Sequence, residues 1–284
     1  MIRPAQYAGS FYAGNSDKLI ESLKECFQSN LGPQKLPEEI DKSEESVPFL
    51  LVPHAGYMYS GSVAAWSYLE LSKYKTPATV IIFGPNHTGW GAEIGVPEKV
   101  EAWETPLGQV KINHELIGKL EEDSGRIKRS DDSHAREHSI EVQLPFLQYI
   151  FQEPFEIIPI ALLDQSLDSS IILGETISRV CEKEDVVVIA SSDLTHFESH
   201  EAATNQDLQV LQAVEEMDIK KMYDLKYGLN VSMCGHGPIA ATIESARKMK
   251  RTKARILKYA TSGDSSGDKR QVVGYGAAAF YAEK

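Results

Sequence analysis

Cysteine is scarce in this sequence: only 3 of the 284 residues are cysteines. Three thiols cannot form the disulfide framework that stabilises many small secreted domains. We therefore expect free thiols and a reducing, cytoplasmic location. Cys26 and Cys181 occupy apolar positions of predicted helices, which indicates that these two thiols serve packing.

Long apolar runs are also absent. The longest runs, such as residues 186–190, are far shorter than the ~20 residues that a membrane-spanning helix needs. The sequence begins Met-Ile-Arg-Pro, without the apolar stretch of a signal peptide. We therefore expect no membrane partner.

Basic residues are outnumbered, with 29 Lys and Arg against 41 Asp and Glu and a net charge of −12. Proteins that bind nucleic acid through phosphate neutralisation need an excess of positive charge, so we predict no nucleic-acid partner. A basic run at residues 247–255 lies at the predicted end of a helix, where the helix dipole favours cations. Apolar residues make up 42% of the chain, which is enough for an ordered core.

Short Val- and Ile-rich runs alternate with helical patterns along the chain. The predicted strands cover residues 47–53, 79–84, 157–162, 186–190, 256–260 and 272–281. The predicted helices cover residues 15–30, 62–74, 113–123, 137–151, 164–181, 200–217 and 236–250, and a polar, acidic loop is expected at 32–48. Continuous apolar strands separated by helices indicate a sheet that is buried on both faces. We predict one α/β domain over residues 1–284, with a mostly parallel central sheet flanked by helices.

Polar residues follow the three strongest strand candidates. His54 follows the first, His87 the second, and Asp193 and His196 the third. Ligands of open α/β sheets bind beyond the carboxyl ends of the strands, so we expect these side chains to share one cleft. Two histidines and a carboxylate suit non-haem Fe(II), and also Zn(II) with an open position. A further histidine could serve as acid or base, although any one of these histidines could also be an ordinary loop or core residue.

Cys234 is a second kind of candidate. It lies just before a predicted helix whose first turn contains Pro238. A helix N-terminus stabilises a thiolate, which would make Cys234 a nucleophile or a metal ligand. The alternative is a small buried residue.

One short motif allows a different chemistry. His134, Glu137 and His138 match the H-x-x-E-H pattern of inverted zinc proteases, in which two histidines share a helix face. Residues 131–133 are typical of a loop, and the helix could begin only near Glu137. A zinc hydrolase that uses these three residues therefore stays open as an alternative.

Eleven short segments, spread from residue 3 to the C-terminal strand, resemble the Memo family. They are Arg3-Pro4-Ala5, Tyr7-Ala8-Gly9-Ser10-Phe11-Tyr12, Pro53-His54-Ala55-Gly56-Tyr57, Ser60-Gly61, Gly84-Pro85-Asn86-His87, Trp103-Glu104-Thr105-Pro106-Leu107-Gly108, Glu137-His138-Ser139-Ile140-Glu141, Ser191-Ser192-Asp193, Cys234-Gly235, Pro238-Ile239 and Thr261-Ser262-Gly263-Asp264. The resemblance implies a fold like that of class III extradiol dioxygenases, in which two His and one Glu hold Fe(II). In the Memo pattern the metal positions fall on His54, His87 and Cys234, with Asp193 and His196 lining the same pocket. A thiolate in place of the carboxylate is a softer ligand, which favours copper(I), zinc or iron.

The resemblance also shapes the functional hypotheses. It implies iron or copper binding, redox roles and, in microbial members, a radical-SAM protein as partner. Our main hypothesis is a metal-dependent oxidoreductase in which His54, His87 and Cys234 bind iron or copper and Asp193 and His196 are catalytic. The alternative is a non-catalytic module that binds a peptide or partner protein in the same cleft. A small molecule or a peptide is the expected occupant.

Overall fold

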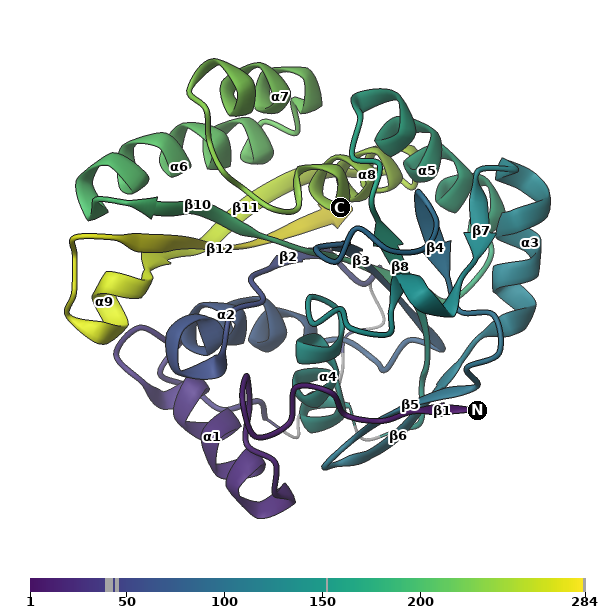
Figure 1. The fold of residues 1–284 in the computed structure, drawn as a ribbon, viewed down its shortest axis with the longest axis horizontal. Coiled ribbons are helices and arrows are strands. Elements are labelled where there is room, and N and C mark those ends of the chain that lie inside the picture. Colours follow the sequence, from purple (N-terminus) through teal and green to yellow (C-terminus); the bar gives the residue numbers. More distant parts are fainter. Residues whose placement is uncertain (39–42, 44–45, 152, 283–284) are drawn as a thin grey trace.

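The computed structural model describes residues 1–38, 43, 46–151 and 153–282, so part of the predicted acidic loop lies outside the described residues. In this described part, twelve strands join one sheet (Figure 1). The strands are β1 (Ile2–Arg3), β2 (Phe49–Val52), β3 (Thr79–Pro85), β4 (Ile94–Val96), β5 (Ala102–Thr105), β6 (Gly108–Ile112), β7 (Ile127–Arg129), β8 (Glu156–Leu162), β9 (Val186–Ser191), β10 (Asp193–Glu198), β11 (Arg251–Thr261) and β12 (Val272–Ala282). The main path of the sheet has the order β1-β5-β6-β8-β3-β9-β2-β12-β10.

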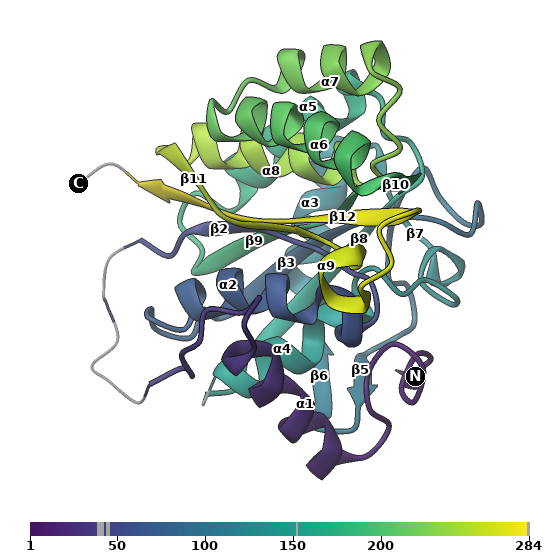
Figure 2. The ribbon, with the colours of Figure 1, turned by 90° about the vertical axis from the view of Figure 1, so that its left-hand side faces the viewer.

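Helices cover both faces of this sheet. They are α1 (Ser16–Gln28), α2 (Ser62–Leu71), α3 (His114–Ser124), α4 (Leu144–Ile150), α5 (Leu167–Val180), α6 (His200–Glu215), α7 (Ile219–Gly228), α8 (His236–Lys248) and α9 (Ser262–Ser266), with short π- or 3-10 turns at η1 (Tyr57–Gly61), η2 (Asp131–Ser133) and η3 (Glu141–Gln143). Figure 2 shows α5, α6, α7 and α8 on one face and α1, α2 and α4 on the other. None of the described helices is both long and apolar enough to span a membrane.

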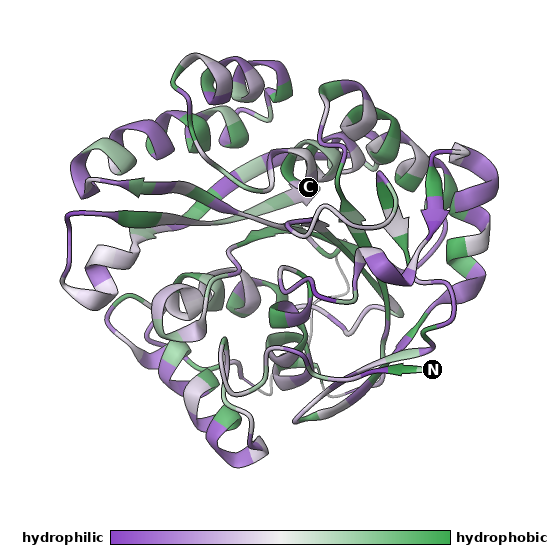
Figure 3. Cartoon of the chain, in the orientation of Figure 1, coloured by the Kyte–Doolittle hydropathy of each residue, from purple (hydrophilic) through white to green (hydrophobic). Residues whose placement is uncertain are grey.

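The centre of the sheet is parallel and fully buried. β8, β3, β9 and β2 run in the same direction in adjacent positions. Helix α8 packs on β3 and β9, and α2 packs on β2 and β12 from the opposite face. Because these strands are covered on both sides, their Val and Ile runs carry no polar alternation. Figure 3 shows the hydrophobic colour along β2, β3 and β8. This part of the prediction is confirmed.

The sheet as a whole is mixed, so the prediction of a mostly parallel sheet is wrong. β12 is antiparallel to β2, β10 and β11, and β5 is antiparallel to β6. β11 and β12 are joined by the short helix α9 and the five residues 267–271, and β5 and β6 by a tight turn. Such short connections produce antiparallel neighbours. The short strands β1, β4 to β7 and β10 and the helices α7 and α9 were not predicted from the sequence.

Most predicted helices form close to their expected ends because side chains cap them. Asn15 accepts hydrogen bonds from the first-turn N–H groups of α1, and Asn113 does the same for α3. The exception is the helix expected at residues 137–151. Its first part is a loop followed by η3, and the α-helix begins only at Leu144.

Candidate metal centre

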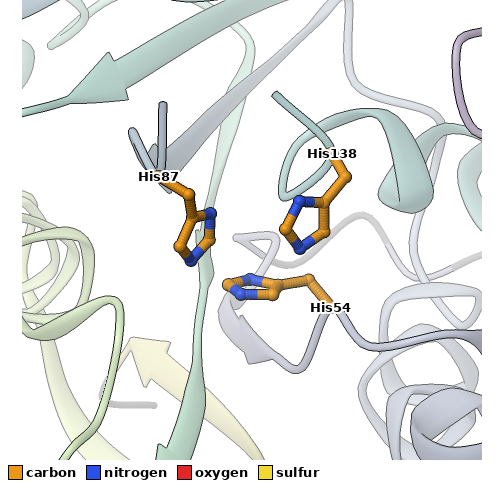
Figure 4. A group of neighbouring side chains, drawn as sticks. All are labelled: His54, His87 and His138. Carbon is orange, nitrogen blue, oxygen red and sulfur yellow. The ribbon is translucent and has the colours of Figure 1, made fainter. Parts of the chain in front are cut away.

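Three histidines from distant parts of the sequence converge beyond the central strands. His54, His87 and His138 each offer one ligand atom, and these atoms lie within 4.8 Å of one another. Figure 4 shows the three rings pointing toward one another. His54 follows β2 and His87 follows β3, and both strands are parallel to β9, which lies between them. The predicted convergence of these two strand ends is therefore what the fold produces.

The ring of His54 is held in one tautomer. Its Nδ1 lies 2.8 Å from Ser191 Oγ, and this hydroxyl donates its one proton to the carbonyl oxygen of Ser139 at 2.6 Å. In the hydrogen bond between His54 and Ser191 the ring Nδ1–H must therefore be the donor, which leaves a lone pair on Nε2. Burial, together with the nearby histidines, keeps the pKa of His54 well below its usual value. The ring is thus neutral, which is the form that binds a metal.

His87 and His138 share a carboxylate neighbour. His87 Nδ1 lies 3.0 Å from Glu137 Oε1, and His138 Nδ1 lies 3.5 Å from the same oxygen. Burial opposes the charged form of His87, but the contact with Glu137 outweighs it and raises the pKa of His87. Burial lowers the pKa of His138 to about 4. The two rings stack with centroids 4.8 Å apart.

Cys234 reaches this centre from the N-terminus of α8. Its Sγ lies 3.1 Å from His54 Nε2 and accepts a hydrogen bond from the backbone N–H of Asp193 at 3.2 Å. Burial, followed by the nearby Asp193 charge, raises the pKa of the Cys234 thiol well above its usual value. Desolvation therefore acts against the thiolate that a helix N-terminus would stabilise in the metal-free chain.

Asp193 and His196 lie on β10, at the rim of the same centre. Asp193 Oδ1 accepts the backbone N–H of His54 at 2.8 Å, and burial raises the pKa of this carboxyl to about 7. The backbone N–H of His196 donates to Ser232 Oγ, and its ring Nδ1 is buried without a partner in the described part of the chain. Burial lowers the pKa of His196. Asp193 therefore fixes the backbone at His54, and no hydrogen bond joins it to the His196 ring among the described residues.

The H-x-x-E-H motif does not form the helix that a zinc protease needs. Arg3 donates to the carbonyl oxygens of His134 and Glu137, each at 2.9 Å, and to Glu141 at 2.5 Å. These contacts occupy carbonyl groups that a helix would use for itself. His134 Nε2 instead lies 3.1 Å from the carbonyl oxygen of Gly95, and His134 is not in the histidine cluster. The zinc-hydrolase hypothesis is wrong for this geometric reason.

Comparison with known proteins agrees with the sequence resemblance. The model of the family described as Memo-like protein matches residues 3–279. A MEMO1 family protein of Saccharolobus islandicus is 44% identical over 284 residues, covering 99% of both chains. A MEMO1 family protein of Methanopyrus kandleri is 44% identical over 282 residues, with the same 99% coverage of each chain.

The chain belongs to the Memo-like family. A solved structure of an uncharacterized Escherichia coli K12 protein has 11% sequence identity and a TM-score of 0.49, and the match covers 81% of this chain and 99% of that one. The dioxygenase-like architecture that the resemblance implies therefore stays a prediction for this Memo-like chain.

Sequence reasoning missed His138 as a member of the histidine cluster of this Memo-like chain. The strand-end argument could not find it, because His138 lies in the loop between η2 and η3 rather than after a central strand. The available signal was the segment Glu137-His138-Ser139-Ile140-Glu141, which matched the family pattern. The donor atoms fit a transition metal, because neutral imidazole nitrogens suit Zn, Cu, Fe and Ni.

Proposed function

We propose that this Memo-like chain is a metal-dependent redox protein in which His54 and His87 hold an iron or copper ion. The observation that carries the proposal is the convergence of three imidazole ligand atoms within 4.8 Å. At His54 and His87 the Nδ1 atoms are already bonded to protein oxygens, which leaves Nε2 available for a metal. This is the arrangement in which a metal-binding histidine is oriented by a partner on its other nitrogen.

Two further residues compete for the remaining positions. His138 completes the three-imidazole set, whereas Cys234 contacts His54 Nε2 directly at 3.1 Å. A metal bound to His54 Nε2 would replace that contact, and the Cys234 sulfur would then lie next to the metal. We propose that Cys234 would then release its thiol proton to water and act as a soft sulfur donor, which favours copper(I), iron or zinc over hard cations.

The chain's own residues supply the remaining functions. A bound iron or copper ion would contribute one-electron chemistry to the site. His196, whose ring Nδ1 has no hydrogen-bond partner among the described residues, is the proposed acid or base for a small-molecule substrate. Asp193 holds the His54 backbone in place through its contact with the N–H group.

Metal analysis of protein purified without chelators tests the proposal. The wild-type chain is expected to bind iron or copper stoichiometrically under anaerobic supply, and His54→Ala is expected to lose it. The residual metal affinities of Cys234→Ala and His138→Ala show which of these two residues contributes more to metal binding. His114→Ala is the control, because His114 lies in α3 outside the cluster. A wild-type chain that binds neither metal would contradict the redox function.

Exposed apolar side chains favour one other function at the same place. Met58, Trp90 and Phe197 are 76%, 58% and 71% exposed, and they follow His54, His87 and His196 within four residues. Such side chains could bind a peptide or partner protein without catalysis, as the alternative hypothesis holds. That function would gain support if the chain binds no metal and if polar substitutions at Trp90 and Phe197 weaken binding of a peptide or partner protein without changing the fold.

A further inference from the structure

Glu137 is a buried carboxylate that contacts two members of the histidine cluster. Its side chain is fully buried, and Oε2 accepts the backbone N–H of His87 at 2.6 Å. Oε1 lies 3.0 Å from His87 Nδ1 and accepts the N–H of Ser139 at 2.8 Å. The same Oε1 lies 3.5 Å from His138 Nδ1.

The charge of this carboxylate has no lysine or arginine partner in the described part of the chain. Arg3 contacts only the backbone carbonyl of Glu137 and directs its charge to Glu141. The ionisable side chains that contact the Glu137 carboxylate are the two imidazoles. An unpaired buried charge is costly, so a cation held by the same imidazoles would compensate it.

The contacts of Glu137 also decide which nitrogen of His87 is free. An ionised carboxylate only accepts hydrogen bonds, so the proton of neutral His87 must lie on Nδ1. Nε2 then carries the lone pair and is available to a ligand. The His87 backbone is held by the other oxygen of the same carboxylate, so Glu137 fixes both the position and the tautomer of this ring.

We propose that Glu137 is the positioning residue of the metal centre: it orients His87 and His138 and supplies the negative charge that a bound cation needs. This inference rests on the proposed function, because it assumes that the histidine cluster holds a metal. Carboxylates that hold a metal-binding histidine typically raise metal affinity roughly 10- to 100-fold.

Glu137→Gln is a sharp test because an amide cannot replace both oxygens. Oε1 and Oε2 each accept from an N–H group, whereas an amide has one oxygen and one NH₂ donor. If the NH₂ replaces Oε1, it faces His87 Nδ1 and Ser139 N–H. If it replaces Oε2, it faces the backbone N–H of His87. In both orientations one backbone N–H group loses its acceptor. In the first orientation the proton of His87 also moves to Nε2.

Titration of the full-length chain with Zn²⁺ and Co²⁺ in the presence of a competing chelator gives the metal affinities. Glu137→Gln is expected to weaken both by roughly 10- to 100-fold, and Glu137→Asp, which keeps the charge, to recover part of the loss. Glu244→Gln is the matched control, since Glu244 is largely buried near the far end of α8 and is expected to leave the affinity unchanged. Thermal unfolding of the metal-free variants checks that each is folded.

A metal-independent readout separates positioning from a general loss of structure. At mildly alkaline pH, ¹⁵N NMR of the metal-free wild-type chain is expected to show the His87 proton on Nδ1, and Glu137→Gln is expected to shift it toward Nε2 when the NH₂ group replaces Oε1. A wild-type chain that binds neither ion would refute the metal centre and this inference with it. Metal binding that is equal in the wild type and Glu137→Gln, or a His87 proton on Nε2 in the wild type, would overturn the role of Glu137 alone.

Discussion

At the scale of single residues, burial decides the chemistry of this Memo-like chain more than position in a secondary-structure element does. Cys234 lies at a helix N-terminus, which favours a thiolate, yet burial raises the pKa of its thiol. Burial likewise lowers the pKa of His134 to about 3, with the charge of Arg3 as a second cause. Each of these groups is therefore expected to stay neutral in the folded, metal-free chain.

His134 makes the stability of the metal-free chain depend on pH. Its pKa is about 3 in the folded state and near 6.5 when unfolded, so the unfolded state binds more protons between these values. Stability is therefore highest above the unfolded pKa and falls as pH drops through that window, by at most about 1.4 kcal/mol per pH unit for this residue. Denaturant unfolding between neutral and mildly acidic pH should show a shallower loss for His134→Gln. Equal slopes in both proteins would contradict this assignment.

At the scale of elements, the N-terminal segment is fastened to the loop that carries the third histidine. Arg3 in β1 pairs with Glu141 in η3, and Glu141 also accepts the hydroxyl proton of Tyr12 and the backbone N–H of Tyr7. Phe11 from the same segment packs on His138, with ring centroids 4.7 Å apart. This loop therefore owes its shape to contacts with residues more than a hundred positions away.

Removing the arginine should loosen that loop. Arg3→Ala leaves the buried Glu141 charge without its partner, a change that typically costs about 3–5 kcal/mol in the free energy of unfolding. Metal affinity should fall as well, because Glu137 and His138 lie in the same loop. Lys220→Ala serves as comparison: it breaks a largely exposed ion pair and should leave denaturant unfolding nearly unchanged. Equal effects of the two substitutions would count against the anchoring role of Arg3.

At the scale of the whole molecule, the candidate site exists only when the sheet is assembled. β9 lies between β2 and β3, and this arrangement brings His54 and His87 to the same edge. Helix α8 packs across β3 and β9 and adds Cys234. The unfolded chain has no such site, so metal binding and folding are thermodynamically linked.

A metal ion should therefore stabilise the folded chain. At a free metal concentration 100 times the Kd, the gain is about 2.7 kcal/mol. For a protein of this size, each kcal/mol raises Tm by roughly 2–4 °C. Differential scanning calorimetry with and without added metal should show this increase for the wild type. His54→Ala should show little or none, and an increase of the same size in that variant would place the metal elsewhere.

The amino-acid sequence was enough to predict the buried strands, most helix ends, and the positions of His54, His87 and Asp193 next to strand ends. These features follow from local signals: continuous apolar runs, capping side chains, and the rule that parallel strands end at one edge. The tertiary structure alone decided that the sheet is mixed, that His138 joins the cluster, and that the Cys234 thiol has a raised pKa. Each of these three features depends on contacts between residues far apart in sequence or on the burial of a side chain. A local sequence pattern predicts neither.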